Sequence, residues 1–181
     1  MWFLDVDGVL NTWDTPHPRH GTYRVVQILV GRRLLRVEYS PSIVARINTM
    51  HTTGLVEVVW LTSWNEHART ALAPMIGLLD FAVVSRPRPG STRWSTLPGT
   101  GVTWWKVGRI LEYLAAQPDR PYIWTDDWLT KHDRLTLRGA GGSPALLIPV
   151  PRTPGLTHAH LDRIEEFCRD VGVTAENRRT E

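Results

Sequence analysis

Two aspartates one residue apart end the first apolar run of the chain. Residues 2–4, Trp-Phe-Leu, have the composition of a buried strand in a parallel sheet, which is apolar on both faces. Because side chains alternate along a strand, Asp5 and Asp7 start out pointing the same way. Two carboxylates held in one place repel each other unless a proton or a cation lies between them. The spacing therefore indicates either metal binding or acid–base chemistry.

Gly8 follows this pair directly. A glycine there lets the backbone turn sharply and come close to a ligand. The plainer interpretation of Asp-X-Asp-Gly is a strand that ends in an Asp-Gly turn, because aspartate and glycine are common turn residues. The first eight residues taken by themselves therefore leave both interpretations open.

Three later features favour the functional interpretation. An apolar strand ends at Thr62 and Ser63, and another ends at the carboxylate pair Asp126 and Asp127. Lys106 stands at the head of an amphipathic helix, in a chain where all but two of the 21 cationic residues are arginine. Lysine and arginine are not interchangeable at a tight site, so a lysine there is informative. Since ligands of open α/β sheets bind at the carboxyl ends of the strands, these residues should converge on one spot.

The order of these motifs resembles the haloacid dehalogenase-like (HAD) phosphohydrolase superfamily over roughly residues 1–150. The four motifs would be Asp-X-Asp-Gly-Val, the strand-end Thr, the Lys and the Asp-Asp pair. Trp64, the Asp-Asp form of the fourth motif and the Pro-Gly-Leu-Thr157 stretch are similar to HAD domains of bacterial and phage RNA-repair proteins. The resemblance implies an α/β fold, with a Rossmann-like parallel sheet, helices on both faces and a small β-hairpin flap or cap after the first motif.

The resemblance also implies a catalytic role for each motif residue. Asp5 attacks phosphorus and forms an aspartyl-phosphate, while Asp7 protonates the leaving alcohol and then activates water. Thr62 hydrogen-bonds a phosphoryl oxygen, and Lys106 neutralises the developing charge. HAD dehalogenases and P-type ATPases lack the acid at position 7, so its presence implies phosphatase or phosphotransferase chemistry.

A divalent cation would let the carboxylates of the first and last motifs lie close together. Ligation by oxygen and water favours Mg²⁺. The resemblance assigns the ligands as the Asp5 carboxylate, the Asp7 backbone carbonyl and the Asp126/Asp127 pair. Asp126 is favoured as the direct ligand of that pair by the family pattern.

Residues beside the motifs are candidates for binding substrate. Trp64 and Trp128 each follow a motif directly, so both are expected at the pocket rim, either stacked on a nucleobase or packed as its wall. Arginines are frequent between residues 15 and 50, which indicates either a basic face for an anionic substrate or an ordinary surface in an arginine-rich protein. The candidates are Gly8, Ser63, Trp64, Asn65, Trp128, Arg32 and Arg33.

A phosphorylated nucleotide or a nucleic-acid phosphate end is the first expectation for the substrate, because a small cap leaves room for a bulky molecule. Receiver domains also group acids, threonine and lysine around Mg²⁺. Their acidic pair comes first and their lysine last, which is not the order here. A catalytically inactive HAD-like module that binds nucleic acid or a protein partner is the other alternative, although all four motif positions are filled.

The 181 residues fit a single domain. We expect it to span residues 1–173, with a flap or cap insertion over 12–40 and a frayed polar tail over 174–181. No stretch approaches the roughly 18–20 apolar residues of a membrane span, and the N-terminus lacks the basic region of a signal peptide. The single Cys168 excludes an internal disulfide. A cytoplasmic protein without a disulfide-linked partner is expected, and no feature indicates an oligomeric state.

Periodicity and turn residues predict the remaining elements. A β-hairpin over 23–39 is expected either as a flap or as a structural hairpin packed on the sheet edge. Pro74 should kink or break its helix. The loop 86–101 carries Arg86, Arg88, Arg93 and Trp94, which would either clamp a phosphate and stack on a base or form mobile surface. Helices are predicted over 40–54, 65–79, 103–116, 129–137 and after Thr157, and strands over 55–61, 81–84, 121–125 and 145–150.

Overall fold

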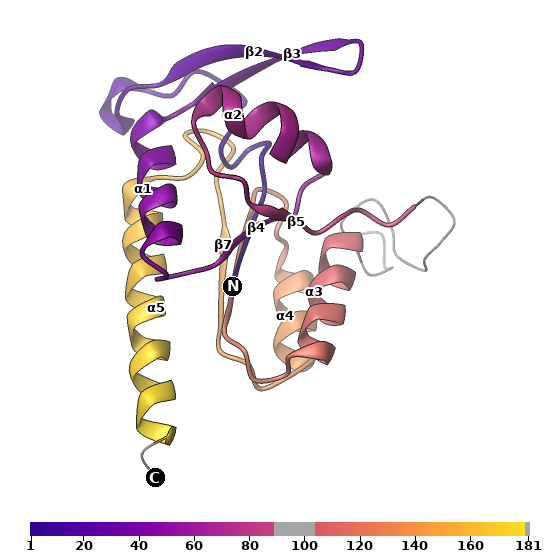
Figure 1. Ribbon diagram of the computed structural model, residues 1–181, viewed down its shortest axis with the longest axis vertical. Helices are drawn as coiled ribbons and strands as arrows, with labels where there is room; N and C mark the ends of the chain where they lie inside the picture. The colour runs from indigo at the N-terminus through magenta and orange to yellow at the C-terminus, as the bar shows by residue number, and fades with distance from the viewer. Residues whose placement is uncertain (89–103, 180–181) are drawn as a thin grey trace.

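Five parallel strands form the central sheet of the computed structural model, which describes residues 1–88 and 104–179 (Figure 1). The strand order is β5–β4–β1–β6–β7. Their bounds are Trp2–Leu4 for β1, Val58–Trp60 for β4, Ala82–Val83 for β5, Tyr122–Asp126 for β6 and Ala145–Pro149 for β7. The short apolar β1 lies at the centre and is buried on both faces, as its sequence predicts.

Helices cover both faces of the sheet, which confirms the predicted fold class. One face carries α1 (Pro41–Thr52), the π-helical segment η2 (Ala68–Leu72), α2 (Ala73–Ile76) and α5 (His158–Arg179). The other face carries α3 (Trp105–Ala116) and α4 (Lys131–Gly139). Because side chains alternate along a strand, Trp2 and Leu4 pack in the first core and Phe3 in the second.

The predicted hairpin is confirmed as β2 (Arg24–Val30) paired with β3 (Arg33–Tyr39), preceded by the short 3₁₀ helix η1 (Pro18–His20). Its buried residues Ile28 and Val37 join the core that contains η2 and α2. In Figure 1 the hairpin crosses the end of the domain beside α2. The hairpin therefore packs on a helix rather than on an edge of the sheet.

Two helices depart from the predicted course. The helix after Asn65 is not broken at Pro74, but its hydrogen bonding changes just before the proline: in η2 the turn widens, and the amide of Ala73 bonds the carbonyl of Ala68, five residues back. This helix ends at Gly77, which has a φ of 82°. At the other end of the chain, α5 continues to Arg179, so residues 174–179 are helical rather than a frayed tail.

Capping residues explain where two other helices begin. Thr130 and Asp133 form a reciprocal capping box, which starts α4 at Lys131, two residues later than predicted. Thr157 precedes α5 and its hydroxyl accepts a hydrogen bond from the His160 amide at 3.4 Å. The predictions for Arg93 and Trp94 lie outside the described residues. None of the described helices is both long and apolar enough to cross a membrane.

Candidate active site

The register of the sheet brings the first and last motifs together. Leu4 of β1 pairs with Thr125 of β6, so the next residues, Asp5 and Asp126, lie level with each other at the carboxyl ends of neighbouring strands. β1 lies between β4 and β6, where the connections of the sheet diverge to opposite sides, and such a point forms a crevice. Both carboxylates are buried there.

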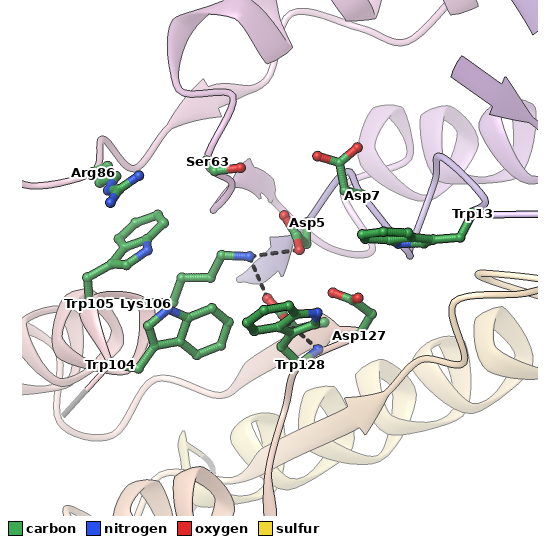
Figure 2. Close-up of a pocket in the computed structure, with 11 residues that line it drawn as sticks. Asp5, Asp7, Trp13, Ser63, Arg86, Trp104, Trp105, Lys106, Asp127 and Trp128 are labelled. Atoms are coloured by element: carbon green, nitrogen blue, oxygen red, sulfur yellow. Dashed lines mark hydrogen bonds and ion pairs between the residues drawn. The ribbon is translucent and has the colours of Figure 1, made fainter. Parts of the chain in front are cut away.

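Lys106 joins these two acids. Its Nζ lies 2.7 Å from Oδ2 of Asp5 and 2.6 Å from Oδ2 of Asp126 (Figure 2). Lys106 is buried in the first turn of α3, with its ammonium 5.0 Å from the centre of the Trp104 ring. A positive charge at a helix N-terminus opposes the helix dipole. The two carboxylates compensate for this, so the position is explained by the site and not by the helix.

Burial has the largest effect on the pKa values of this cluster. It raises the pKa of Asp5 to about 7; Lys106 opposes this rise, and the charge of Asp126 adds to it. Burial likewise raises the pKa of Asp126. Burial lowers the pKa of Lys106, but its ion pairs with Asp126 and Asp5 outweigh that effect and the pKa is raised overall. Two carboxylates share one ammonium, so the cluster lacks one positive charge when both acids are ionised.

Asp127 adds a third carboxylate to the same place. Asp5, Asp126 and Asp127 each place one oxygen within 4.8 Å of the others. Burial raises the pKa of Asp127 to about 6, the charge of Asp5 adds to this rise, and its ion pair with Arg152 opposes it. A set of oxygen donors with a deficit of positive charge fits Mg²⁺.

Gly8 makes room for that third carboxylate. Its φ is 72°, in the left-handed region that favours glycine. A Cβ at this position would lie 2.5 Å from Cγ of Asp127. The glycine of the first motif therefore allows the loop after β1 to approach the fourth motif closely.

Asp7 lies beside the cluster, and each of its carboxylate oxygens accepts a hydrogen bond. Its Oδ2 accepts a hydrogen bond from Nε1 of Trp64 at 2.8 Å, and its Oδ1 accepts one from Nδ2 of Asn11 at 2.9 Å. Oδ1 of Asn11 in turn accepts from the amide of Glu38 at 3.0 Å, which ties this loop to the hairpin. Trp64 is 8% exposed, so of the two predicted roles the structure favours packing over stacking on a base.

The hydroxyls after β4 differ from expectation. Thr62 is fully buried, and its Oγ1 accepts a hydrogen bond from the amide of Trp64 at 3.3 Å. Ser63 is exposed and lines the pocket, as Figure 2 shows. The side chain predicted to meet a phosphoryl oxygen therefore faces inward, and its neighbour faces the open space.

One protein-family model matches the sequence of this chain. Its description is "HAD domain in Swiss Army Knife RNA repair proteins", and it matches residues 1–161. The chain belongs to this family. No curated protein sequence and no solved structure matches the chain. Membership confirms the resemblance seen in the motifs, and it indicates a phosphohydrolase-type activity on a phosphorylated substrate.

The HAD domain has a cavity of about 250 Å³ above the acidic cluster. In Figure 2, Trp104 and Trp105 stand on one side, Trp13 on the opposite side and Trp128 below. The complete lining is Asp5, Asp7, Trp13, Ser63, Arg86, Trp104, Trp105, Lys106, Asp126, Asp127 and Trp128.

Of the remaining candidates for substrate binding, two lie at or beside the cavity and two lie away from it. Trp128 lines the cavity and is 38% exposed, as its position after the fourth motif predicts. Asn65 has a positive φ of 48°, and its Oδ1 accepts a hydrogen bond from the Arg86 amide at 2.7 Å, so it positions a lining residue. Arg32 and Arg33 are exposed at the hairpin turn and do not line the cavity.

Three aromatic residues that line the cavity were not predicted from the sequence. Trp104 and Trp105 directly precede Lys106, so their position beside a predicted catalytic residue could have identified them. Trp13 lies within the predicted insertion over 12–40 and is the part of it that reaches the cavity. Arg152, which pairs with Asp127 at 2.8 Å, follows β7 and carried no local signal.

Proposed function

We propose that this HAD domain hydrolyses a phosphate monoester through an aspartyl-phosphate on Asp5, with Mg²⁺ as cofactor. The observation that carries the proposal is the pairing of one buried lysine with two buried carboxylates, at the bottom of a cavity that Asp7 also lines. A buried charge cluster with raised acid pKa values is costly for folding and is typical of a functional site.

The side chains supply the steps of the reaction. An oxygen of Asp5 attacks phosphorus, and the bond from phosphorus to the leaving alcohol breaks. Asp7 gives its proton to that alcohol, and then takes a proton from the water that attacks the phosphorus of the aspartyl-phosphate and releases phosphate. Lys106 offsets the negative charge that gathers in the transition state.

Mg²⁺ would be held by the carboxylates of Asp5, Asp126 and Asp127 together with the Asp7 carbonyl. Its chemistry there is to neutralise phosphate charge, so that an anionic carboxylate can approach. Within the pair we favour Asp126 as the direct ligand, as the family pattern indicates, because its buried carboxylate lies level with Asp5 at the end of the neighbouring strand.

Removal of the metal tests this proposal directly. Phosphate release from an aryl phosphate is expected to need Mg²⁺ and to fall to background in EDTA. Asp126→Asn is expected to abolish both phosphate release and Mg²⁺ binding measured by calorimetry. Mg²⁺ binding without turnover of the aryl phosphate would indicate a selective enzyme. Neither binding nor turnover would contradict the proposal and favour an inactive HAD-like binding module.

Ser63 is proposed to meet the phosphoryl oxygen in place of Thr62. Ser63→Ala is expected to lower kcat/KM about tenfold, because one hydrogen bond to a charged oxygen is lost. Thr62→Val removes a buried acceptor of the Trp64 amide, so it should lower the free energy of unfolding by about 1 kcal/mol or more. Steady-state kinetics and urea unfolding on both variants separate these effects. A larger kinetic effect at Thr62 than at Ser63 would restore the original assignment.

Trp64 is proposed to position Asp7. Trp64→Phe keeps the buried ring but removes the indole donor, so the proton donor loses one of its two side-chain partners. Hydrolysis of an alkyl phosphate, whose leaving group needs the proton, is expected to fall about tenfold or more. A nitrophenyl phosphate, whose leaving group departs as an anion, should be affected much less. Equal losses of kcat/KM on both substrates would contradict a role in protonating the leaving group through Asp7.

A nucleotide or a nucleic-acid phosphate end is the substrate that the cavity supports best. Four tryptophans line the cavity that contains the acidic cluster, and indole faces stack on nucleobases. Efficient cleavage of sugar phosphates with no activity on nucleotides or oligonucleotides would contradict this step. We further propose a cytoplasmic setting, consistent with the single unpaired Cys168.

A further inference from the structure

Arg152 lies beside the active-site cavity, over two tryptophan rings that line it. Its guanidinium carbon is 4.7 Å from the ring centre of Trp13 and 5.2 Å from that of Trp128. Its Nε donates a hydrogen bond to Oδ2 of Asp127 at 2.8 Å. Arg152, Asp127 and Trp128 also line a second cavity of about 410 Å³, so this cluster stands between two hollows in the surface.

The backbone holds this cluster in place. The amide of Trp13 donates to the carbonyl of Arg152 at 3.2 Å, and the amide of Asp14 donates to Oγ1 of Thr153 at 3.3 Å. Two loops far apart in the sequence are therefore joined beside the active site. A site whose side chains are fixed before a ligand arrives loses less conformational entropy on binding.

The exposed groups of this cluster match one kind of ligand. Trp13 is 55% exposed, which is a large apolar surface to leave in water. Among the described residues, no hydrogen bond involves the two Nη nitrogens of Arg152. Its guanidinium therefore keeps donors for an anion, and arginine suits phosphate because its donors form a planar fork. The indole faces beside it suit the face of a base, whatever its identity.

A purely structural role explains less of this arrangement. Neutralising Asp127 requires the Nε contact, but it requires neither of the exposed tryptophans. Asp127 is also one of the three carboxylates of the proposed Mg²⁺ site. A single carboxylate thus separates the proposed Mg²⁺ site from Arg152.

We propose that Arg152, Trp13 and Trp128 form a second subsite that binds the leaving-group side of the substrate. Arg152 takes another phosphate on the same nucleoside, and the tryptophans take the base. The preferred substrate is then a nucleoside that carries two phosphates at different positions, as the terminal nucleotide of a phosphorylated oligonucleotide does. This inference rests on the proposed phosphatase activity and adds to it the part of the pocket that selects the substrate.

Ratios of kcat/KM test the subsite, because a general defect at Asp127 lowers both members of a ratio equally. Three phosphate esters are compared: a nucleoside 3′,5′-bisphosphate, the matching nucleoside monophosphate and ribose 5-phosphate. The wild type is expected to favour the bisphosphate over the monophosphate by about tenfold, as one charge-assisted contact allows. Arg152→Gln should bring this ratio close to one. Arg120→Gln is the matched control, since Arg120 pairs with Glu57 on the surface and its loss should leave the ratio unchanged.

A second ratio of kcat/KM values tests the contact of the tryptophans with the base. Trp13→Ala is expected to lower the preference for the monophosphate over ribose 5-phosphate about fivefold or more, because one stacking contact with the base is lost. Equal losses on all three esters in Arg152→Gln would mean that Arg152 only supports Asp127, and would overturn the subsite. A wild type that does not distinguish bisphosphate from monophosphate would overturn it as well.

A binding measurement separates this inference from the proposed function. Titration of the wild type with the same bisphosphate is followed by tryptophan fluorescence in EDTA, where no turnover is expected. Binding that weakens about tenfold in Arg152→Gln supports the subsite even if no ester is hydrolysed. Equal binding by both proteins overturns it, whatever the hydrolysis assays show.

Discussion

Replacing Asp5 with asparagine is expected to lower kcat for phosphate-ester hydrolysis by about 10⁴-fold or more. An amide oxygen is a poor nucleophile, and the neutral side chain also withdraws one charged ligand from Mg²⁺. Acid-quenched reactions with a radiolabelled phosphate ester should leave label on the wild-type chain and none on Asp5→Asn. Asp80→Asn is a matched control, because Asp80 is an exposed acid paired with Arg69 and should retain full activity. More than about 1% residual activity in Asp5→Asn would contradict nucleophilic catalysis by this residue.

The same variant should remain folded, and its relative stability should depend on pH in a defined direction. Asp5 loses its proton near pH 3.8 when unfolded and near 7 when folded. Between these values the unfolded chain binds fewer protons, so the wild type loses stability as the pH rises. Asparagine does not titrate. Without metal, the stability of Asp5→Asn relative to wild type should rise from pH 4 to 7 and level off above, which melts in EDTA would show.

The parts of the site that the sequence predicted are those fixed by local patterns. Asp5 and Asp126 each lie at the end of an apolar strand, and parallel strands end at the same edge of a sheet. Their meeting therefore needs only the alternation of elements and one register. Lys106 was identifiable because a lone lysine headed an apolar helix in an arginine-rich chain.

The direction in which each side chain points could not be predicted from local sequence patterns. The turn after β4 decides whether Thr62 or Ser63 faces the cavity, and it is fixed by the Trp64 amide and by the positive φ of Asn65. Arg152 and Trp13 meet only because the loops after β7 and after the first motif lie together. Such contacts depend on tertiary packing, so no spacing in the sequence signals them.

Lys106→Met is expected to lower the free energy of unfolding by about 3–5 kcal/mol at neutral pH, because Asp5 and Asp126 stay buried without their shared cation. Activity should fall about 10²–10³-fold or more, since the charge on the transferring phosphoryl group is no longer offset. Urea unfolding should show a smaller loss at pH 5 than at pH 8, because the carboxylates in the variant can take up protons. Lys131→Met replaces the other lysine of the chain, exposed at the start of α4, and should change stability by less than about 0.5 kcal/mol.

Neutralising the acids separates the charge of Lys106 from its packing. Lys106→Met combined with Asp5→Asn and Asp126→Asn leaves a cluster of similar volume with no buried charge. If uncompensated charge causes the instability, this triple variant should recover most of the lost stability and none of the activity. A triple variant as unstable as Lys106→Met would instead assign the effect to packing against Trp104 and Trp105. Recovery would mean that the cluster is retained for its chemistry, at a cost to the stability of the fold.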